Sequence, residues 1–191
     1  MPILWREVSL KEITLNMPSK QSIALIGPMG SGKTSVGRRL ACVLKRDFFD
    51  SDHEIVARTG VSIDHIFDVE GEEGFRERET NILSELLVIP DMVIATGGGI
   101  IIKRENRDLL KKNAFVIYLS SSIDQLIKRT LLSKNRPLLE KSNNREKTIK
   151  KIVNEREPWY QETADVTIDT SGKKLYVIIN EIKKILNNEK K

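Results

Sequence analysis

The feature that most constrains this chain is a glycine-rich run, GPMGSGKT, at residues 27–34. An apolar run at residues 22–27 leads into it, which is typical of a buried parallel strand. Val36, Leu40 and Leu44 follow it at helical spacing. The run matches the Walker A pattern G-x-x-x-x-G-K-[ST], in which backbone N–H groups surround phosphates, the lysine reaches the terminal ones and the hydroxyl ligates magnesium. The sequence therefore predicts a strand, a phosphate-binding turn and a helix, in that order.

Strand and helix patterns alternate along the rest of the chain. Short apolar runs predict four more strands, at residues 47–50, 92–96, 114–119 and 165–169. Helical patterns lie between and after them, at residues 51–60, 62–69, 74–88, 105–112, 123–132, 146–155 and 174–186. Such alternation is typical of a parallel sheet with helices on both faces. We therefore predict a three-layer α/β/α fold with a central five-stranded parallel sheet. Ser51 and Glu54 have the spacing of a capping box, which predicts that Ser51 caps the helix after the second strand.

Composition favours a single globular domain. The chain has 191 residues, of which 39% are hydrophobic and 31% are charged. No segment approaches the roughly 20 apolar residues that cross a bilayer, and the first residues lack the pattern of a secretory signal, so we expect a cytoplasmic protein without a membrane partner. The single cysteine, Cys42, excludes an internal disulfide, and we expect it to be inert packing among apolar neighbours. The net charge of +5 suits a polyanionic partner without deciding which one.

The chain divides into one domain and two flanking segments. We assign residues 22–187 to a single domain, residues 1–21 to an N-terminal extension of unassigned role, and residues 188–191 to a frayed tail. Within the domain, the polar run SKNRPLLEKSNN at residues 133–144 has the composition of a mobile lid.

Carboxylates and glycines stand where three of the predicted strands end. In an open parallel sheet the ligand lies beyond the carboxyl ends of the strands, so these ends should converge on one crevice. Asp50 and Asp52 could hold the water shell of Mg²⁺ or accept a proton from a substrate hydroxyl. Alternatively, Asp50 only ends a strand and Asp52 only complements the helix dipole. The glycines at residues 97–99 allow either a close approach by a substrate or simply a turn with positive φ.

Taken together, these motifs resemble the shikimate kinase family over residues 23–186. The resemblance is carried by GPMGSGKTSVGRRLA, FFDSDHEI, IFDVEGEEGFRERE, ATGGGI, RPLL and NEREPWYQETADVTI. The D-S-D pair, the G-E-x-x-F-R run, the triple glycine and R-P-L-L, in this order, separate that family from nucleoside monophosphate kinases and gluconate kinases. The resemblance implies a P-loop NTPase fold of the nucleoside monophosphate kinase type with a mobile lid. It also implies a helical substrate-binding segment at about residues 51–88.

The resemblance further implies where ATP and magnesium bind. Lys33 would hold the β- and γ-phosphates, and Arg136 in the lid would close onto them. Arg129 resembles a second nucleotide-facing arginine, although a cation near a helix end is also common. Thr34 would ligate Mg²⁺, and Asp50 would contact the metal through water. The implied ATP-binding residues are Gly30, Ser31, Gly32, Lys33, Thr34, Ser35, Arg129 and Arg136.

An acceptor site around Asp52 is implied as well. Asp52 would accept a hydrogen bond from the attacking hydroxyl and act as the catalytic base, with Lys33 and Arg136 as the other catalytic residues. Arg76 and Arg156 would clamp a carboxylate, because arginine forms paired planar hydrogen bonds that lysine cannot reproduce. Alternatively, Arg76 is a surface charge and Arg156 belongs to a helix-end salt bridge. The pocket would be completed by backbone of the glycine run Gly97, Gly98 and Gly99, chiefly Gly98.

The implied reaction is transfer of the γ-phosphate of ATP to the 3-hydroxyl of shikimate by a monomer, with Mg²⁺ as cofactor. The alternatives are another small-metabolite kinase, such as one for gluconate, and a nucleotide-dependent regulatory module without an acceptor. We do not expect nucleic-acid binding, because there is no basic stripe with interleaved aromatics and only 5% of residues are aromatic. His53 and His65 lack partners at metal-ligand spacing, so we expect both on solvated helix faces.

Overall fold

Five strands form one parallel sheet at the centre of the structure. The computed structural model describes residues 22–131 and 145–188. The strands pair in the order β2-β3-β1-β4-β5, and every pairing is parallel. Their bounds are β1 Ser22–Ile26, β2 Asp47–Asp50, β3 Met92–Ala95, β4 Ala114–Ser120 and β5 Val166–Asp169. The predicted five-stranded parallel sheet is confirmed.

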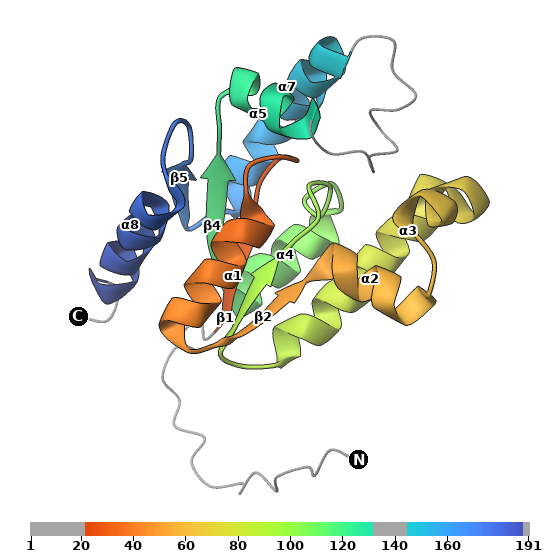
Figure 1. The fold of residues 1–191 in the computed structure, drawn as a ribbon. Coiled ribbons are helices and arrows are strands. Elements are labelled where there is room, and N and C mark those ends of the chain that lie inside the picture. The colour runs from red at the N-terminus through yellow and green to blue at the C-terminus, as the bar shows by residue number, and fades with distance from the viewer. Residues whose placement is uncertain (1–21, 132–144, 189–191) are drawn as a thin grey trace, which may run out of the picture.

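Helices cover both faces of this sheet, which makes the fold a three-layer α/β/α arrangement (Figure 1). Alternate residues of a strand point to opposite faces. Ile23 and Leu25 therefore share one core with α1 (Lys33–Leu44) and α8 (Leu175–Asn188). Ala24 and Ile26 belong to the core on the other face, with side chains from α2 Ser51–Thr59, α3 Ile63–Val88, α4 Arg104–Asn113 and α7 Arg145–Thr163. A third, smaller cluster joins α7 to α5 (Ile123–Leu131).

The central position of β1 brings together the segments that follow β1, β2 and β3. On one side β1 pairs with β3, where Leu25 is opposite Ala95, and on the other it pairs with β4, where Ile26 is opposite Tyr118. β3 in turn pairs with β2, where Asp50 is opposite Ala95. The carboxyl ends of these strands consequently lie at one edge of the sheet, where a ligand is expected to bind.

The helix after β2 begins differently from our prediction. The N-cap of α2 is Asp50, whose side chain accepts hydrogen bonds from the backbone N–H groups of Asp52 and His53. Ser51, which we predicted as the cap, is fully buried, and its hydroxyl accepts a hydrogen bond from the Gly97 N–H at 3.0 Å. The spacing of residues along α2 could not reveal this contact, because the two partners are 46 residues apart in the chain.

A kink at Gly71 divides α3. Gly71 has φ 74° and ψ −175°, which is not helical, and this agrees with the two separate helices that the sequence predicts here. Glu70 and Arg78 are joined across the kink by two hydrogen bonds of 2.8 and 2.7 Å. The rings of Phe67 and Phe75 also pack across it, with centroids 4.7 Å apart. The kink therefore places two aromatic side chains beside each other.

Two helices run further than expected. α7 continues through Pro158 to Thr163, well past the predicted end at residue 155. α8 reaches Asn188, one residue into the segment that we assigned to the tail. The predicted lid, the N-terminal extension and residues 189–191 lie outside the described residues. Among the described helices, none has both the length and the apolar character needed to cross a membrane.

The isolated cysteine and the histidines lie at the surface. Cys42 is exposed, so the prediction that it serves as inert packing among apolar neighbours was wrong. It falls on the outer side of α1, whose inner side carries Val36 and Leu40 into the core. His53 and His65 are both exposed, as predicted.

The fully buried Leu83 provides a test of the core between α3 and the sheet. We expect Leu83→Ala to lower the free energy of unfolding by about 2–5 kcal/mol, because it removes buried hydrocarbon and leaves a cavity. Val88→Ala, at a position of the same helix that is 83% exposed, should change it by about 0.5 kcal/mol or less. Urea denaturation followed by circular dichroism measures both, and equal effects would contradict the assigned packing.

Candidate active site

The loop between β1 and α1 has the backbone of a phosphate-binding turn. Gly27 has φ 143°, and a Cβ atom there would lie 2.5 Å from the Leu119 carbonyl oxygen, so only glycine fits. Gly32, at φ 97°, is the N-cap of α1 and offers no side chain to the first turn of that helix. The first N–H groups of α1 can therefore bind an anion.

Lys33 is the buried cation of this loop. Its Nζ donates hydrogen bonds to the carbonyl oxygens of Gly27 at 2.8 Å and Pro28 at 3.0 Å. The loop is also held from outside, because the Thr170 hydroxyl donates to the Ser31 carbonyl at 3.2 Å. The ammonium is thus oriented within the turn, close to the position that a terminal phosphate would take.

Thr34 and Asp50 bring two hard oxygen ligands together. The Thr34 hydroxyl donates a hydrogen bond of 2.7 Å to Asp50 Oδ2. Among the residues that the structure describes, no three or more His, Cys, Asp or Glu side chains form a group that could hold a metal ion. Mg²⁺ commonly takes only one or two protein oxygens and completes its shell with phosphate and water. The Thr34–Asp50 pair fits that mode of binding.

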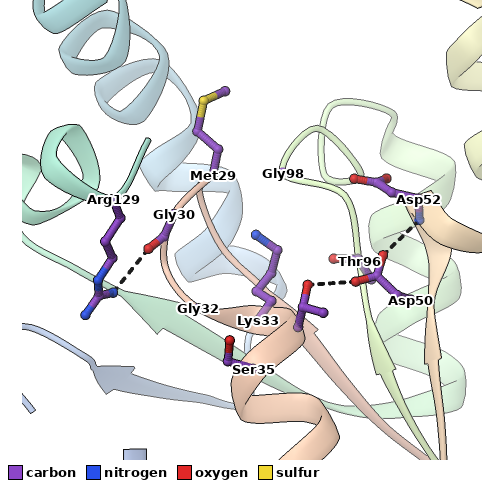
Figure 2. A pocket seen from close by; sticks show the side chains of 11 residues that line it. Met29, Gly30, Gly32, Lys33, Ser35, Asp50, Asp52, Thr96, Gly98 and Arg129 are labelled. Atoms are coloured by element: carbon purple, nitrogen blue, oxygen red, sulfur yellow. Dashed lines mark hydrogen bonds between the residues drawn. The ribbon is translucent and has the colours of Figure 1, made fainter. Parts of the chain in front are cut away.

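An open cleft of 320 Å³ surrounds these groups. Figure 2 shows Lys33 and Ser35 on one side of it, Asp50 and Asp52 on another, and Arg129 reaching from α5 toward the loop at Gly30. The cleft is lined by Met29, Gly30, Gly32, Lys33, Thr34, Ser35, Asp50, Asp52, Thr96, Gly98 and Arg129. Most of the expected nucleotide-binding residues are therefore together. Ser31 is not among them, because its side chain is turned into the protein and is only 1% exposed.

Arg129 joins the cleft to a second hollow of 350 Å³, which is lined by Gln125, Lys128, Arg129, Gly172 and Lys173. Its guanidinium donates to the Gly30 carbonyl at 3.1 Å and to Gln125 Oε1 at 3.0 Å. These contacts fix the charge at the junction of the two hollows. That position fits a nucleotide-facing arginine better than a cation that only complements a helix end.

A smaller pocket of 100 Å³ adjoins the cleft on the side of α3. It shares Met29, Asp52 and Gly98 with the cleft. The other lining residues are Ile63, Phe67, Phe75, Arg76, Glu79, Gly97, Gly99 and Arg156. This lining combines an apolar wall with two arginines, which suits a small carboxylic acid that has an apolar ring.

Arg76 is a buried charge with two carboxylate partners. It pairs with Glu79, which is fully buried, and with Glu72 at 3.0 Å. Burial acts to lower the pKa of Arg76, but the two ion pairs outweigh it and raise that pKa, so the guanidinium remains charged. Burial also raises the pKa of Glu79 to about 7, an effect that the Asp52 carboxylate reinforces and Arg76 opposes. The surface-charge interpretation of Arg76 is therefore excluded.

The glycine run lies directly against these side chains. A Cβ atom at Gly97 would be 2.5 Å from Glu79 Oε1 and 2.6 Å from Asp52 Oδ1, and one at Gly99 would overlap the Arg76 guanidinium. None of the three glycines has positive φ. Of the two alternatives for this run, the structure supports close approach, here by the side chains that line the pocket. Arg156, half-buried within α7, donates to the Gly98 carbonyl at 3.2 Å.

Comparison with known proteins now decides the family, because the sequence model described as "Shikimate kinase" matches residues 29–187. The chain belongs to the shikimate kinase family. The shikimate kinase of Chromohalobacter salexigens is 46% identical to it over 166 residues, which are 87% of this chain and 92% of the relative. A solved structure, "Shikimate kinase from Acinetobacter baumannii in complex with shikimate", superposes with a TM-score of 0.86 at 43% identity and covers 90% of this chain and 96% of that one. The shikimate kinase structure from Aquifex aeolicus has a TM-score of 0.77 at 33% identity, covering 88% and 97%.

Membership of the shikimate kinase family confirms the expected fold type, while several site residues came only from the structure. Glu79 follows Arg76 by three positions, a spacing that could have suggested an ion pair on a helix. Met29 occupies a variable position of the Walker pattern, so the motif gave no sign that it would line both pockets. Tyr160, whose hydroxyl donates to the Gly98 carbonyl, was also missed, although it lies in the NEREPWYQETADVTI run and four residues after Arg156. Arg136 lies outside the described residues.

The buried carboxyl of Glu79 predicts a pH dependence of stability. Its folded pKa of about 7 lies above the ordinary value of 4.5, so the stabilisation from the protonated form is complete below pH 4.5 and is lost as the pH rises through 7. Glu79→Gln keeps a neutral side chain throughout. We expect its stability relative to the wild type to rise between pH 4.5 and 7, by on the order of 3 kcal/mol or less.

Urea denaturation at several pH values in this window measures the difference. Glu77→Gln is the matched control, because Glu77 lies on the same helix and is exposed. A difference between Glu79→Gln and the wild type that stays constant with pH would contradict the prediction.

Proposed function

We propose that this chain transfers the γ-phosphate of ATP to the 3-hydroxyl of shikimate, giving shikimate 3-phosphate and ADP. The observation that carries this proposal is the meeting of two pockets at Met29, Asp52 and Gly98. One pocket contains a phosphate-binding loop, and the other contains two arginines and an apolar wall. The choice of the 3-hydroxyl rests on the family resemblance. We also propose a monomer as the active form, a proposal that rests on the family resemblance alone.

On the nucleotide side, the backbone of the Walker loop and the ammonium of Lys33 would bind the β- and γ-phosphates. Arg129 would add a positive charge at the junction toward the second hollow. Thr34 and Asp50 would hold Mg²⁺, with Asp50 acting through water, and the metal would supply neutralisation of phosphate charge when bound. Arg136, outside the described residues, would complete the cationic site from the lid.

On the acceptor side, Arg76 and Arg156 would hold the shikimate carboxylate by charge-assisted hydrogen bonds. Ile63, Phe67 and Phe75 would cover the apolar part of the ring. Asp52 lies in both pockets, so its carboxylate could accept the proton of the attacking hydroxyl as the oxygen approaches the γ-phosphate. Phosphoryl transfer requires mainly positioning and charge neutralisation, and the residues of the two pockets supply both.

The lining of the smaller pocket favours this function over its alternatives. Gluconate also carries a carboxylate, but it is an open chain and lacks a ring whose carbon face could pack on the apolar wall of α3. A regulatory module would not need a second pocket with a buried arginine at the edge of its nucleotide cleft. Shikimate therefore fits the described residues better than either alternative.

A coupled ADP-release assay tests the proposed function. With Mg²⁺ and ATP, shikimate, gluconate, a nucleoside monophosphate and no acceptor are compared in parallel, using the wild type and Lys33→Ala. We expect turnover with shikimate alone and its loss in Lys33→Ala, because that variant lacks the charge that neutralises the phosphates. Turnover with gluconate, or ATP hydrolysis that no acceptor changes, would overturn the acceptor assignment.

Asp52→Asn tests the proposed base. We expect the variant to bind ATP normally but to lose about 10²–10⁴-fold in kcat with shikimate, because an amide cannot accept the hydroxyl proton. Asp108→Asn makes the same chemical change on α4, where the Asp108 side chain is 67% exposed, and should retain full turnover. Steady-state kinetics and calorimetric ATP binding give both readouts, and unchanged turnover in Asp52→Asn would remove this residue from the chemistry.

A further inference from the structure

Gly98 stands between the two pockets and lines both of them. A Cβ atom at this position would be 3.2 Å from the Met29 backbone nitrogen and 3.6 Å from the Gly27 carbonyl oxygen. The glycine run is thus packed against the Walker loop itself. Any displacement of Gly98 would therefore change the shape of the smaller pocket where it adjoins the phosphate-binding turn.

The carbonyl oxygen of Gly98 accepts two hydrogen bonds from α7. The Tyr160 hydroxyl donates one at 2.5 Å, and Arg156 Nη1 donates the other at 3.2 Å. Arg156 and Tyr160 are four residues apart, so they lie on the same face of the helix. Because a trans peptide is planar, fixing the Gly98 carbonyl also fixes the Gly99 N–H, which belongs to the same peptide unit.

Tyr160 is held rigidly enough to serve as an anchor. Its side chain is fully buried, and its ring stacks on that of Tyr118 in β4, with centroids 4.9 Å apart and an angle of 13° between the planes. The Tyr118 hydroxyl donates to Glu157 Oε2 at 2.6 Å and does not contact the glycine run. Burial raises the pKa of the Tyr160 hydroxyl above its usual range, so this group remains a donor throughout the neutral pH range.

We propose that Tyr160 is a positioning residue for the acceptor substrate, because its hydroxyl holds the Gly98 peptide in the orientation that the smaller pocket requires. This inference rests on the proposed function. Arg156 would be shared between the Gly98 carbonyl, the Tyr160 hydroxyl and the acceptor, whereas the one hydrogen bond that Tyr160 donates goes to the carbonyl. When the substrate engages Arg156, Tyr160 keeps the glycine run in place.

Loss of the Tyr160 hydroxyl should therefore weaken binding of shikimate and leave binding of ATP unchanged. The nucleotide cleft is held by contacts of Lys33, Thr170 and Arg129 with the Walker loop, and Tyr160 makes none of them. Tyr160→Phe removes one hydrogen bond from Gly98, together with the contact between the hydroxyl and Arg156, and keeps the ring. We expect the KM for shikimate to rise about fivefold, with the KM for ATP and kcat changed by less than about twofold.

Tyr118→Phe is the matched control, because it removes a buried hydroxyl from the other ring of the same stack. Thermal denaturation of both variants should show similar, small losses of stability, while only Tyr160→Phe raises the KM for shikimate. Amide hydrogen exchange of the ligand-free protein should also be faster at residues 97–102 in Tyr160→Phe alone. The turns of this segment are closed by hydrogen bonds from the Ile100 N–H to the Gly97 carbonyl and from the Ile102 N–H to the Gly99 carbonyl.

Each outcome decides one question. A selective rise in the KM for shikimate together with faster exchange in Tyr160→Phe supports the inference. An unchanged KM for shikimate in Tyr160→Phe, or an equal rise in Tyr118→Phe, overturns it while leaving the proposed function intact. Absence of shikimate turnover in the wild type would instead refute the proposed function, and the exchange result would then report only the anchoring of Gly98.

Discussion

β1 forms hydrogen-bonded ladders with β3 and β4 at once, and the arrangement of the site depends on these two ladders. All five residues of β1 are buried, so the strand is fixed from both faces as well as from both edges. The pairing with β3 continues beyond the strand itself, because the Thr96 N–H and hydroxyl both donate to the Leu25 carbonyl, at 3.1 and 3.0 Å. The start of the glycine run is therefore tied to the strand that leads into the Walker loop.

The buried ion pair of Arg76 and Glu79 also organises the site. Arg76 and Glu79 would each be costly to bury alone, and a buried pair is tolerated only when its partners satisfy most of the remaining hydrogen-bonding groups. Glu72 supplies one such partner from the exposed side of α3. This arrangement holds the Arg76 guanidinium beside Gly99 before any substrate arrives, which reduces the reorganisation that binding would require.

The absence of side chains in the glycine run then allows the buried charged residues to approach its backbone closely. The space that a side chain would need at the glycine run is already filled by Glu79, Asp52 and the Arg76 guanidinium. Gly98 packs on the Walker loop and receives two hydrogen bonds from α7, so segments from three distant parts of the chain meet at one residue. Such convergence would place the proposed acceptor next to the terminal phosphate, and positioning of this kind is the main requirement of phosphoryl transfer.

The sequence alone was sufficient for the succession of strands and helices along the chain, the phosphate-binding turn and the family. These depend on short-range features: apolar runs, helical periodicity and a motif whose spacing reflects local backbone geometry. It also pointed to Asp52, from its position after a predicted strand. Arg76 and Arg156 were indicated through resemblance, since no local pattern distinguishes a buried arginine from one on the surface.

Only the tertiary structure decided what depends on distant partners. Ser51 proved to bond Gly97 instead of capping α2, because a hydroxyl takes whichever donor the fold brings to it. The raised pKa of Glu79 follows from burial and from Asp52, and neither is visible in a helical run of charged residues. The hydrogen bond from Tyr160 to Gly98 joins residues 62 positions apart, and it exists because α7 contributes to the same hydrophobic core as β1 and β3. Local spacing determines which elements form, whereas packing determines which side chains meet.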